Sequence, residues 1–384
     1  MKETRIMTIG DVCATISDTY RAKADEVTLI NTSDVLEGKV LNHVRVPNKE
    51  LKGQFKKTFK RDDILYSEIR PQNKRFAFVD FDPVDYIAST KLMVLRADTS
   101  KVLPMYLYLY LKSAPVIAEL QMLAETRSGT FPQITFTELS NLTIPVPNIE
   151  EQEAIVATIK CLEDKIDCNA RINDNLQQQA ATLFDNFYNQ AETEVSLTEI
   201  IQILGGGTPK TGESSYWNGN VPFFTPKDVG LPYTLTTEKT ITEEGLAHCN
   251  SRLYPINTVF VTARGTVGKV GLPGVPMAMN QPCYALVGKG IHQLLVYFYT
   301  LKAVDRLKHK ASGAVFDAIT TRDFESEVIM KLSDVDAKAF LDVTEPIYQA
   351  ILSNSIENLR LTALRDSLLP KLMSGEIDVS EIHL

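Results

Sequence analysis

The sequence predicts an α+β protein with an internal repeat, in which two β-rich α/β domains are joined by two long paired helices. Three observations predict this arrangement. Short segments recur at a fixed offset, two long segments carry a helical seam, and basic and acidic regions alternate along the chain. The 384 residues are 44% hydrophobic and 23% charged, which is ordinary for a globular protein and argues against disorder.

The repeat is visible in the two regions predicted to form β-rich domains, residues 1–148 and 191–333. Residues 29–35 match residues 223–229, and residues 63–70 match residues 257–264, in both cases at an offset of 194. Both members of the second pair are β-rich runs that end in arginine, which predicts equivalent strands. The polar loop residues differ between the halves, as expected for a duplicated binding domain with two specificities.

The remaining segments, residues 149–190 and 334–374, are predicted as helices, followed by a tail at 375–384. Apolar residues and asparagines follow a four-three spacing in both segments, the pattern of a coiled-coil seam. The spacing is unbroken in the first segment, and Arg365 occupies one seam position of the second. An amphipathic helix lying on a core is the alternative, but asparagines at matching seam positions favour two helices that pair with each other. The predicted pairing residues are Ile166, Asn169, Asn173, Leu176, Ile351, Asn354, Asn358 and Leu361.

The net charge of −8 hides an uneven distribution. Residues 39–75 and residues 252–310 each carry an excess of seven positive charges, whereas residues 149–199 carry an excess of eight negative charges. A solvated face explains any single basic region, but two equal basic regions in corresponding places indicate two phosphate-binding surfaces. The acids Glu151, Glu163, Asp164, Glu357 and Asp366 are predicted to face outward from the helices, toward a partner's basic surface or solvent.

No catalytic or metal-binding pattern is evident in the sequence. The glycine-rich residues 205–212 have Pro209 where a nucleotide-binding loop requires glycine, so a simple turn is the better interpretation. The five cysteines include no C-x-x-C pair and the five histidines are scattered, which disfavours zinc and favours reduced thiols in a cytoplasmic protein. No apolar run is long enough for a membrane helix. These features favour a binding protein over an enzyme.

Arg70 and Arg264, at the ends of the matched strands, are predicted to contact DNA, although each arginine has the alternative of pairing with an acid such as Glu68. Neighbouring side chains supply further donors for phosphates and base edges. The full set of predicted DNA-binding residues is Asn31, Thr32, Ser33, Lys56, Lys57, Arg70, Gln72, Asn73, Lys74, Arg75, Ser128, Thr130, Thr225, Lys227, Arg264, Thr266, Lys269, Asn280, Gln281 and Ser312.

Several short motifs lie in the two β-rich domains and near the C-terminus. They are Gly-Gly-Thr-Pro at 206–209, Tyr-Trp-Asn-Gly at 216–219, the segment 221–228, the domain exit at 128–134 and 142–147, and the C-terminal segment 368–377. Together these motifs resemble those of specificity (S) subunits of type I restriction-modification systems, and the resemblance covers essentially the whole chain. The first half lacks the Gly-Gly-Thr-Pro and Tyr-Trp elements found in the second, and the second domain exit departs from the family pattern at 312–317.

This resemblance implies a non-catalytic subunit whose two target-recognition domains are joined by antiparallel helices. Each domain would read one half of a split double-stranded DNA sequence, and the helices would fix the gap and bind two methyltransferase (M) subunits. S-adenosylmethionine would belong to those M subunits, and ATP and Mg to motor-nuclease (R) subunits, with no cofactor in this chain. The alternatives are a self-contained methyltransferase or nuclease, and a coiled-coil adaptor without sequence-specific DNA binding.

Overall fold

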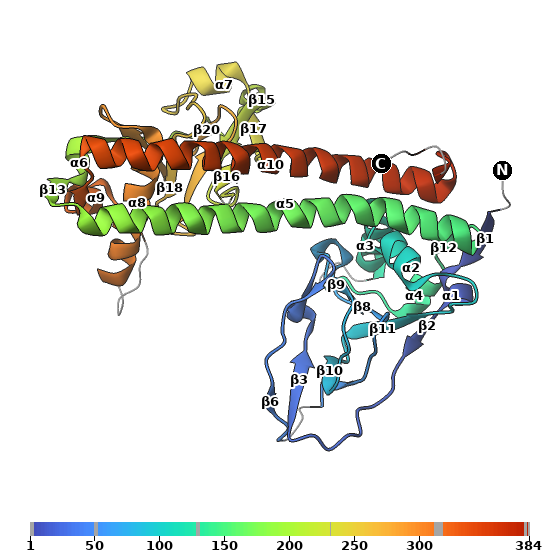
Figure 1. The fold of residues 1–384 in the computed structure, drawn as a ribbon. Helices are drawn as coiled ribbons and strands as arrows, with labels where there is room; N and C mark the ends of the chain where they lie inside the picture. The colour runs from blue at the N-terminus through green and yellow to red at the C-terminus, as the bar shows by residue number, and fades with distance from the viewer. Residues whose placement is uncertain are drawn as a thin grey trace. The chain divides into compact units, whose positions relative to one another are not determined.

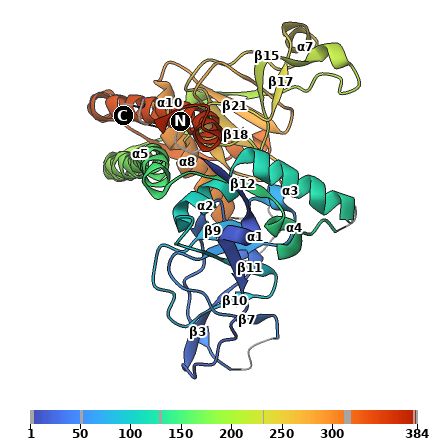
Figure 2. The same cartoon turned by 90° about the vertical axis from the view of Figure 1, so that its right-hand side faces the viewer.

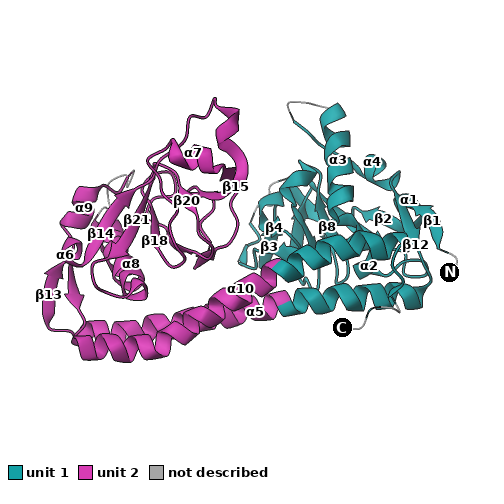
Figure 3. Cartoon of the chain, turned by 90° about the horizontal axis from the view of Figure 1, so that it is seen from above, with its two compact units in different colours: residues 1–165, 360–384 teal, residues 166–359 magenta. Residues whose placement is uncertain are grey.

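The computed structural model describes residues 4–49, 53–127, 131–230, 232–310, 318–379 and 382. The chain divides into two compact units: unit 1 contains residues 1–165 and 360–384, and unit 2 contains residues 166–359 (Figure 3). Each unit holds one β-rich domain together with one end of each long helix. Within the described ranges, no helix is long and apolar enough to cross a membrane.

The two longest helices are α5 (Ile149–Gln190) and α10 (Asp334–Ser374), which lie side by side in Figures 1 and 2. Asn169 donates from Nδ2 to Oδ1 of Asn358 at 2.9 Å, and Asn354 donates from Nδ2 to Oδ1 of Asn173 at 2.8 Å. Residue numbers thus rise along one helix as they fall along the other. The helices are antiparallel, and the predicted coiled-coil pairing is confirmed.

The seam is closed by the side chains that the four-three spacing predicts. Ile351 is fully buried, and Ile166, Leu176 and Leu361 are half-buried. At the start of α5 the side chain of Asn148 accepts a hydrogen bond from the backbone N–H of Glu151 at 3.0 Å, which caps the first turn. The last helical residue of α10 precedes Gly375, whose φ of 73° ends the helix.

The domain of unit 1 is built on two four-stranded sheets, in the orders β2-β11-β8-β9 and β6-β3-β10-β7, with the strand pairs β1–β12 and β4–β5 beside them. Its strands are β1 (Arg5–Thr8), β2 (Cys13–Ile16), β3 (Glu26–Ile30), β4 (Val35–Leu36), β5 (Lys39–Val40), β6 (Val46–Pro47), β7 (Phe55–Lys57), β8 (Ile64–Ser67), β9 (Phe76–Phe78), β10 (Tyr86–Ser89), β11 (Leu92–Ala97) and β12 (Thr143–Val146). Its helices are α1 (Ile9–Val12), α2 (Pro104–Leu111), α3 (Ala114–Arg127) and α4 (Phe136–Ser140), with single turns η1 (Thr32–Asp34) and η2 (Pro71–Asn73).

The domain of unit 2 has a five-stranded sheet in the order β14-β21-β18-β19-β16, a three-stranded sheet β17-β15-β20 and the pair β13–β22. Its strands are β13 (Thr193–Ser196), β14 (Ile201–Gly205), β15 (Trp217–Phe224), β16 (Tyr233–Thr234), β17 (Lys239–Ile241), β18 (Val259–Thr262), β19 (Val270–Pro273), β20 (Ala278–Met279), β21 (Cys283–Gly288) and β22 (Val328–Lys331). Its helices are α6 (Leu197–Ile200), α7 (Glu243–Ala247), α8 (Gln293–Lys310) and α9 (Thr321–Glu325), with the turn η3 (Ser214–Tyr216).

The predicted repeat is present in the topology of the two domains. The sheet order β2-β11-β8-β9 recurs as β14-β21-β18-β19, and the antiparallel pair β1–β12 recurs as β13–β22. The parallel pair β3–β10 recurs as β15–β20. Even the capping boxes recur, because Thr8 and Ser196 cap α1 and α6, while Thr135 and Thr320 cap α4 and α9.

The alignment of the arginine-ending strands is wrong by one residue. Glu68 donates its N–H to the carbonyl of Lys91 and accepts from the N–H of Ile134, and Ala263 makes the same two bonds with Pro282 and Ile319. The true offset at β8 and β18 is therefore 195, which makes Arg70 equivalent to Gly265 and not to Arg264. Both strands are buried on both faces, so their sequences lack the alternation that normally fixes register.

Each unit has one main apolar core that joins its domain to the long helices. In unit 1, Tyr66 of β8, Tyr106 of α2 and Leu120 of α3 share a core with Ile155 of α5 and Leu369 of α10. In unit 2, side chains of β18 and α8 likewise pack with α5 and α10 in a single cluster. The helices thus form part of the hydrophobic core of each unit, which holds the domain surfaces in place.

Candidate nucleic-acid interface

Unit 1 brings together two of the predicted DNA-binding segments, which are the turn after β3 and the β8–β9 turn (residues 70–75). Arg75 of the β8–β9 turn donates from Nη1 to the carbonyl of Ser33 at 3.0 Å and to that of Val35 at 3.3 Å. These bonds fix the two turns against each other. They also engage the guanidinium group of Arg75, so this residue, predicted to contact DNA, has a structural role in the folded chain.

The β8–β9 turn has a constrained backbone and an exposed rim. Arg70 and Lys74 adopt left-handed conformations with φ of 44° and 52°, on either side of η2. The N–H of Gln72 donates to the side-chain carbonyl of Gln121 at 3.2 Å, which anchors the turn to α3. The side chains of Arg70, Gln72 and Asn73 are exposed, so the fixed backbone presents their guanidinium and amide donors to solvent.

Other predicted contacts in unit 1 are engaged within the protein. Lys57 donates from Nζ to the carbonyls of Thr90 at 3.1 Å and Leu92 at 2.8 Å, and burial lowers the pKa of its ammonium group. The side chain of Asn31 accepts from the N–H of Thr32 and caps η1. Lys74 forms an exposed ion pair with Glu37 at 3.2 Å.

Three further predicted DNA-binding residues of unit 1 have side chains that are exposed or half-buried. Lys56 on β7 and Ser33 in η1 are exposed, and Thr32 is half-buried. Ser128 and Thr130, like Ser312 of the second half, lie outside the described residues. The predicted DNA contacts of these three residues therefore stay predictions.

In unit 2 the β18–β19 turn (residues 264–269) corresponds to the β8–β9 turn. The whole connection between the strands, residues 263–269, is one residue shorter than residues 68–75 of unit 1. Gly265 and Gly268 take positive φ of 83° and 73°, which match the left-handed positions of Arg70 and Lys74. Arg264 and Lys269 are exposed, and within the described residues neither side chain has a hydrogen-bond or ion-pair partner. The turn thus offers two uncommitted cations on a backbone that glycine allows to adopt this shape.

The segments around the β18–β19 turn hold it in place. Thr266 donates from Oγ1 to the carbonyl of Pro226 at 3.2 Å, which ties the turn to the segment after β15. There Asp228 accepts from the N–H and the hydroxyl of Thr225 at 2.7 and 2.6 Å, the same cap that Asp34 provides to the N–H of Asn31. Thr225 is therefore committed to the fold in the same way as Asn31.

The last predicted residues of unit 2 divide into engaged and exposed side chains. Lys227 is exposed and lies 3.8 Å from Glu238. Asn280 is half-buried and accepts from the thiol of Cys283. The side chain of Gln281 is exposed, and its N–H donates to Thr208 at 3.4 Å, which brings the glycine-rich segment to the same region.

The glycine-rich residues 205–212 serve packing. A Cβ on Gly206 would lie 2.0 Å from the carbonyl oxygen of Asn280, and one on Gly207 would lie 2.5 Å from the N–H nitrogens of Asn250 and Ser251. The segment leads to the single turn η3 and not to a helix that would bind phosphate at its N-terminus. Gly205 is the last residue of β14, and residues 206–210 form an irregular loop that ends in a turn at residues 211–212.

Sequence reasoning missed an aromatic surface in unit 2. Tyr216 stacks on His248 at 5.1 Å between ring centroids, and Lys239 lies 5.7 Å from the ring centroid of Trp217. The consecutive aromatic residues were a usable signal, but their basic partners come from segments more than 20 residues away. In the residues described here, no group of three or more His, Cys, Asp or Glu side chains is arranged to hold a metal ion.

Comparison with known proteins identifies the family. The sequence profile described as "Type I restriction modification DNA specificity domain" matches residues 1–178 and again residues 190–331. The chain belongs to this family. It is 31% identical to the HindI specificity subunit of Haemophilus influenzae over 98% of this chain and 100% of that one. It is also 29% identical to the EcoR124I/EcoR124II specificity subunit of Escherichia coli, over 58% of this chain and 56% of that one.

One solved structure shows the same fold as this type I specificity subunit. The S subunit from M. genitalium superposes with a TM-score of 0.58 at 16% identity, and the match covers 97% of this chain and 96% of that chain. The fold class predicted from sequence is therefore confirmed. The two profile matches give this specificity subunit one DNA specificity domain in each half, and the β8–β9 and β18–β19 turns are equivalent features of those domains.

Proposed function

We propose that this specificity subunit binds a bipartite double-stranded DNA target, with each domain reading one half and the paired helices fixing the unread gap. The supporting observation is that equivalent turns of one repeated fold carry different free donors. The β8–β9 turn exposes Arg70, Gln72 and Asn73, whereas the β18–β19 turn exposes Arg264 and Lys269. Two domains with the same scaffold and unlike side chains suit two unlike half-sites.

The chemistry of these side chains separates those suited to base contacts from those suited to phosphate contacts. Arginine pairs with guanine through two hydrogen bonds in the major groove, and asparagine or glutamine pairs with adenine in the same way. Lysine contacts phosphates without sequence preference. On this basis Arg264, Gln72 and Asn73 are the candidates for base contacts, and Lys56 and Lys269 are the candidates for phosphate contacts.

The subunit itself is proposed to be non-catalytic and to direct adenine methylation and restriction by its partners. Two M subunits would bind S-adenosylmethionine, and R subunits would use ATP and Mg, so this chain would hold no cofactor. Family membership supports this assignment, because the domain that its profile describes is a DNA specificity domain. The internal repeat supports two copies of one partner, since it provides two related surfaces.

Methylome sequencing of cells with and without this chain tests the proposal and yields the target sequence. Purified complex should then bind the target duplex with strong salt dependence, and Arg264→Ala should weaken binding by ~1–3 kcal/mol and relax one base position of one half-site. Arg360→Ala, which removes an exposed arginine of α10, is the matched control and should leave binding unchanged. A complex that assembles without salt-dependent duplex binding would favour the adaptor alternative.

A further inference from the structure

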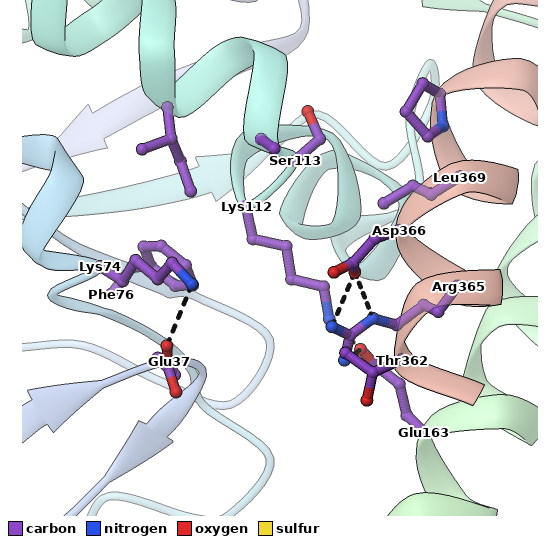
Figure 4. A pocket seen from close by; sticks show the side chains of 13 residues that line it. Glu37, Lys74, Phe76, Lys112, Ser113, Glu163, Thr362, Arg365, Asp366 and Leu369 are labelled. Carbon is purple, nitrogen blue, oxygen red and sulfur yellow. Dashed lines mark hydrogen bonds and ion pairs between the residues drawn. The ribbon is translucent and has the colours of Figure 1, made fainter. Parts of the chain in front are cut away.

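The repeat places a cavity at the same position in each unit. In unit 1 a cavity of about 410 Å³ lies between the β8–β9 turn, the α2–α3 junction and the long helices (Figure 4). In unit 2 a cavity of about 530 Å³ lies between the β18–β19 turn, α8 and α5. Phe76 and Val270, which line the two cavities, occupy equivalent strand positions, because they pair with Tyr66 and Val261.

An ion-pair cluster lines one side of the cavity of unit 1. Lys112, at the end of α2, pairs with Glu163 of α5, and Arg365 of α10 lies 3.6 Å from the same carboxylate. Arg365 also pairs with Asp366 at 2.7 Å. The side chain of Lys112 is only 14% exposed. Figure 4 shows these groups pointing toward one another across the cavity from Lys74 and Glu37. Glu163 is half-buried between two cations, which corrects the prediction that it faces outward, whereas Asp366 is exposed as predicted.

The equivalent position of unit 2 is aromatic. The seam asparagines of the two helices are related by an offset of 185, which makes Tyr348 equivalent to Glu163 and Ala180 equivalent to Arg365. Tyr348 packs against Tyr297 and Phe298, with ring centroids 5.7 and 5.8 Å apart. One ion pair, between Lys302 and Asp185 at 2.7 Å, lines this cavity, but its side chains are 32% and 47% exposed.

We propose that Lys112, Glu163 and Arg365 are positioning residues that hold the first domain at its working angle on the helices, and that recognition of the first half-site depends on them. The inference rests on the function proposed above. Poorly solvated charges stabilise a contact between a domain and the helices only while all partners are present, because removing one leaves the others uncompensated. The aromatic contact in unit 2 depends on the shapes of the packed rings, so the second domain does not depend on ion pairs in this way.

The location of the cluster explains why recognition would be affected. Lys74 and Glu37 line the same cavity as Lys112, so the β8–β9 turn lies directly across from the ion pairs. A shift of α2 against α5 and α10 therefore moves the side of the cavity that lies opposite the β8–β9 turn. When the ion pairs are removed, the apolar contacts of Ile155 and Leu369 still hold the domain on the helices. The angle between the domain and the helices is then less constrained.

The test measures discrimination at each half-site separately, with duplexes altered in one half or the other. The half-site of the first domain is the one whose recognition changes in Gln72→Ala. Lys112→Met keeps the side-chain length and removes the charge, and it should reduce discrimination at that half-site by roughly tenfold, about what one bidentate base contact supplies. Discrimination at the other half-site should stay at the wild-type level. Lys112→Arg, which keeps the charge, should restore discrimination at the half-site of the first domain.

Lys302→Met is the control in unit 2, because it removes the Lys302–Asp185 ion pair that lines the second cavity and should leave both half-sites unchanged. Glu163→Gln is a second variant should Lys112→Met fail to fold, and it should give the same one-sided loss. Equal loss at both half-sites, or no loss at either in a folded variant, would overturn the inference. Wild-type complex that discriminates at neither half-site would instead refute the proposed function.

Discussion

The asparagine pairs of the seam lead to a quantitative prediction about stability. Asn354 donates to Oδ1 of Asn173 at 2.8 Å, and Asn173 is only 7% exposed. Replacing Asn354 with leucine leaves that oxygen without its donor in a poorly solvated seam, which costs ~1–3 kcal/mol of unfolding free energy. In the double variant Asn173→Leu/Asn354→Leu, both amides are gone and two leucines pack instead, each contributing about 1.5–3 kcal/mol when fully buried.

We therefore expect the single variants to be less stable than wild type and the double variant to equal or exceed it. The coupling free energy of this double-mutant cycle should be about 1–3 kcal/mol. Urea unfolding followed by far-ultraviolet circular dichroism measures it, because α5 and α10 supply much of the helical signal. Asn186→Leu, at an exposed position of α5, is the control and should change stability by less than about 0.5 kcal/mol.

Effects that add to within about 0.5 kcal/mol would refute the pairing of these amides. If the cycle behaves as expected, the wild-type asparagines are no more stabilising than leucines at the same positions. Their retention is then explained by register, because a buried amide pair is satisfied in only one axial alignment of the helices. Cross-linking of cysteines placed along the helices should accordingly show one register for wild type and several for the double variant.

Three further outcomes are expected. Because Asn173 faces Asn354 on the antiparallel helix, Gln177 faces a residue four places earlier on α10. Seven-residue insertions after Gln177 and after Gln349 should therefore lengthen the gap of the methylated target by roughly three base pairs. An unchanged gap would show that the helices do not set its length. Burial raises the pKa of the Cys13 thiol to about 12, so a thiol reagent at pH 8 should modify the exposed Cys168 and spare Cys13 until the chain is unfolded. Gly207→Ala should cost about 1–3 kcal/mol of stability in thermal unfolding, because its Cβ would lie 2.5 Å from backbone nitrogens.

The long helices and their pairing were predictable because their determinants are local. A four-three spacing can be counted along the chain, and matching asparagines identify which segments share a seam. Pro346 does not interrupt α10, since it lies on an exposed face. The direction of pairing came from family resemblance, and the amide contacts of Asn169 and Asn173 confirm it.

The repeat was predictable as a whole but not to the residue. Similar β-rich runs aligned at an offset of 194, whereas the backbone hydrogen bonds of Glu68 and Ala263 require 195 in this strand. A strand buried on both faces has apolar residues at every position, so a shift of one residue leaves the sequence pattern unchanged. The positive φ of Arg70 and Gly265 marks their true equivalence.

The sequence by itself determined which segments of the chain are basic, which are helical and which are repeated. Only the tertiary structure decided which charges are available. Arg75 and Lys57 donate to backbone carbonyls of other segments, and Glu357, predicted to face outward, accepts from Asn169 at 2.7 Å. Charge is a property of the residue, whereas availability depends on partners that lie tens to hundreds of positions away in the chain. Those partners meet only when strands and helices pack, because each buried polar group must then find a hydrogen-bond partner within the protein.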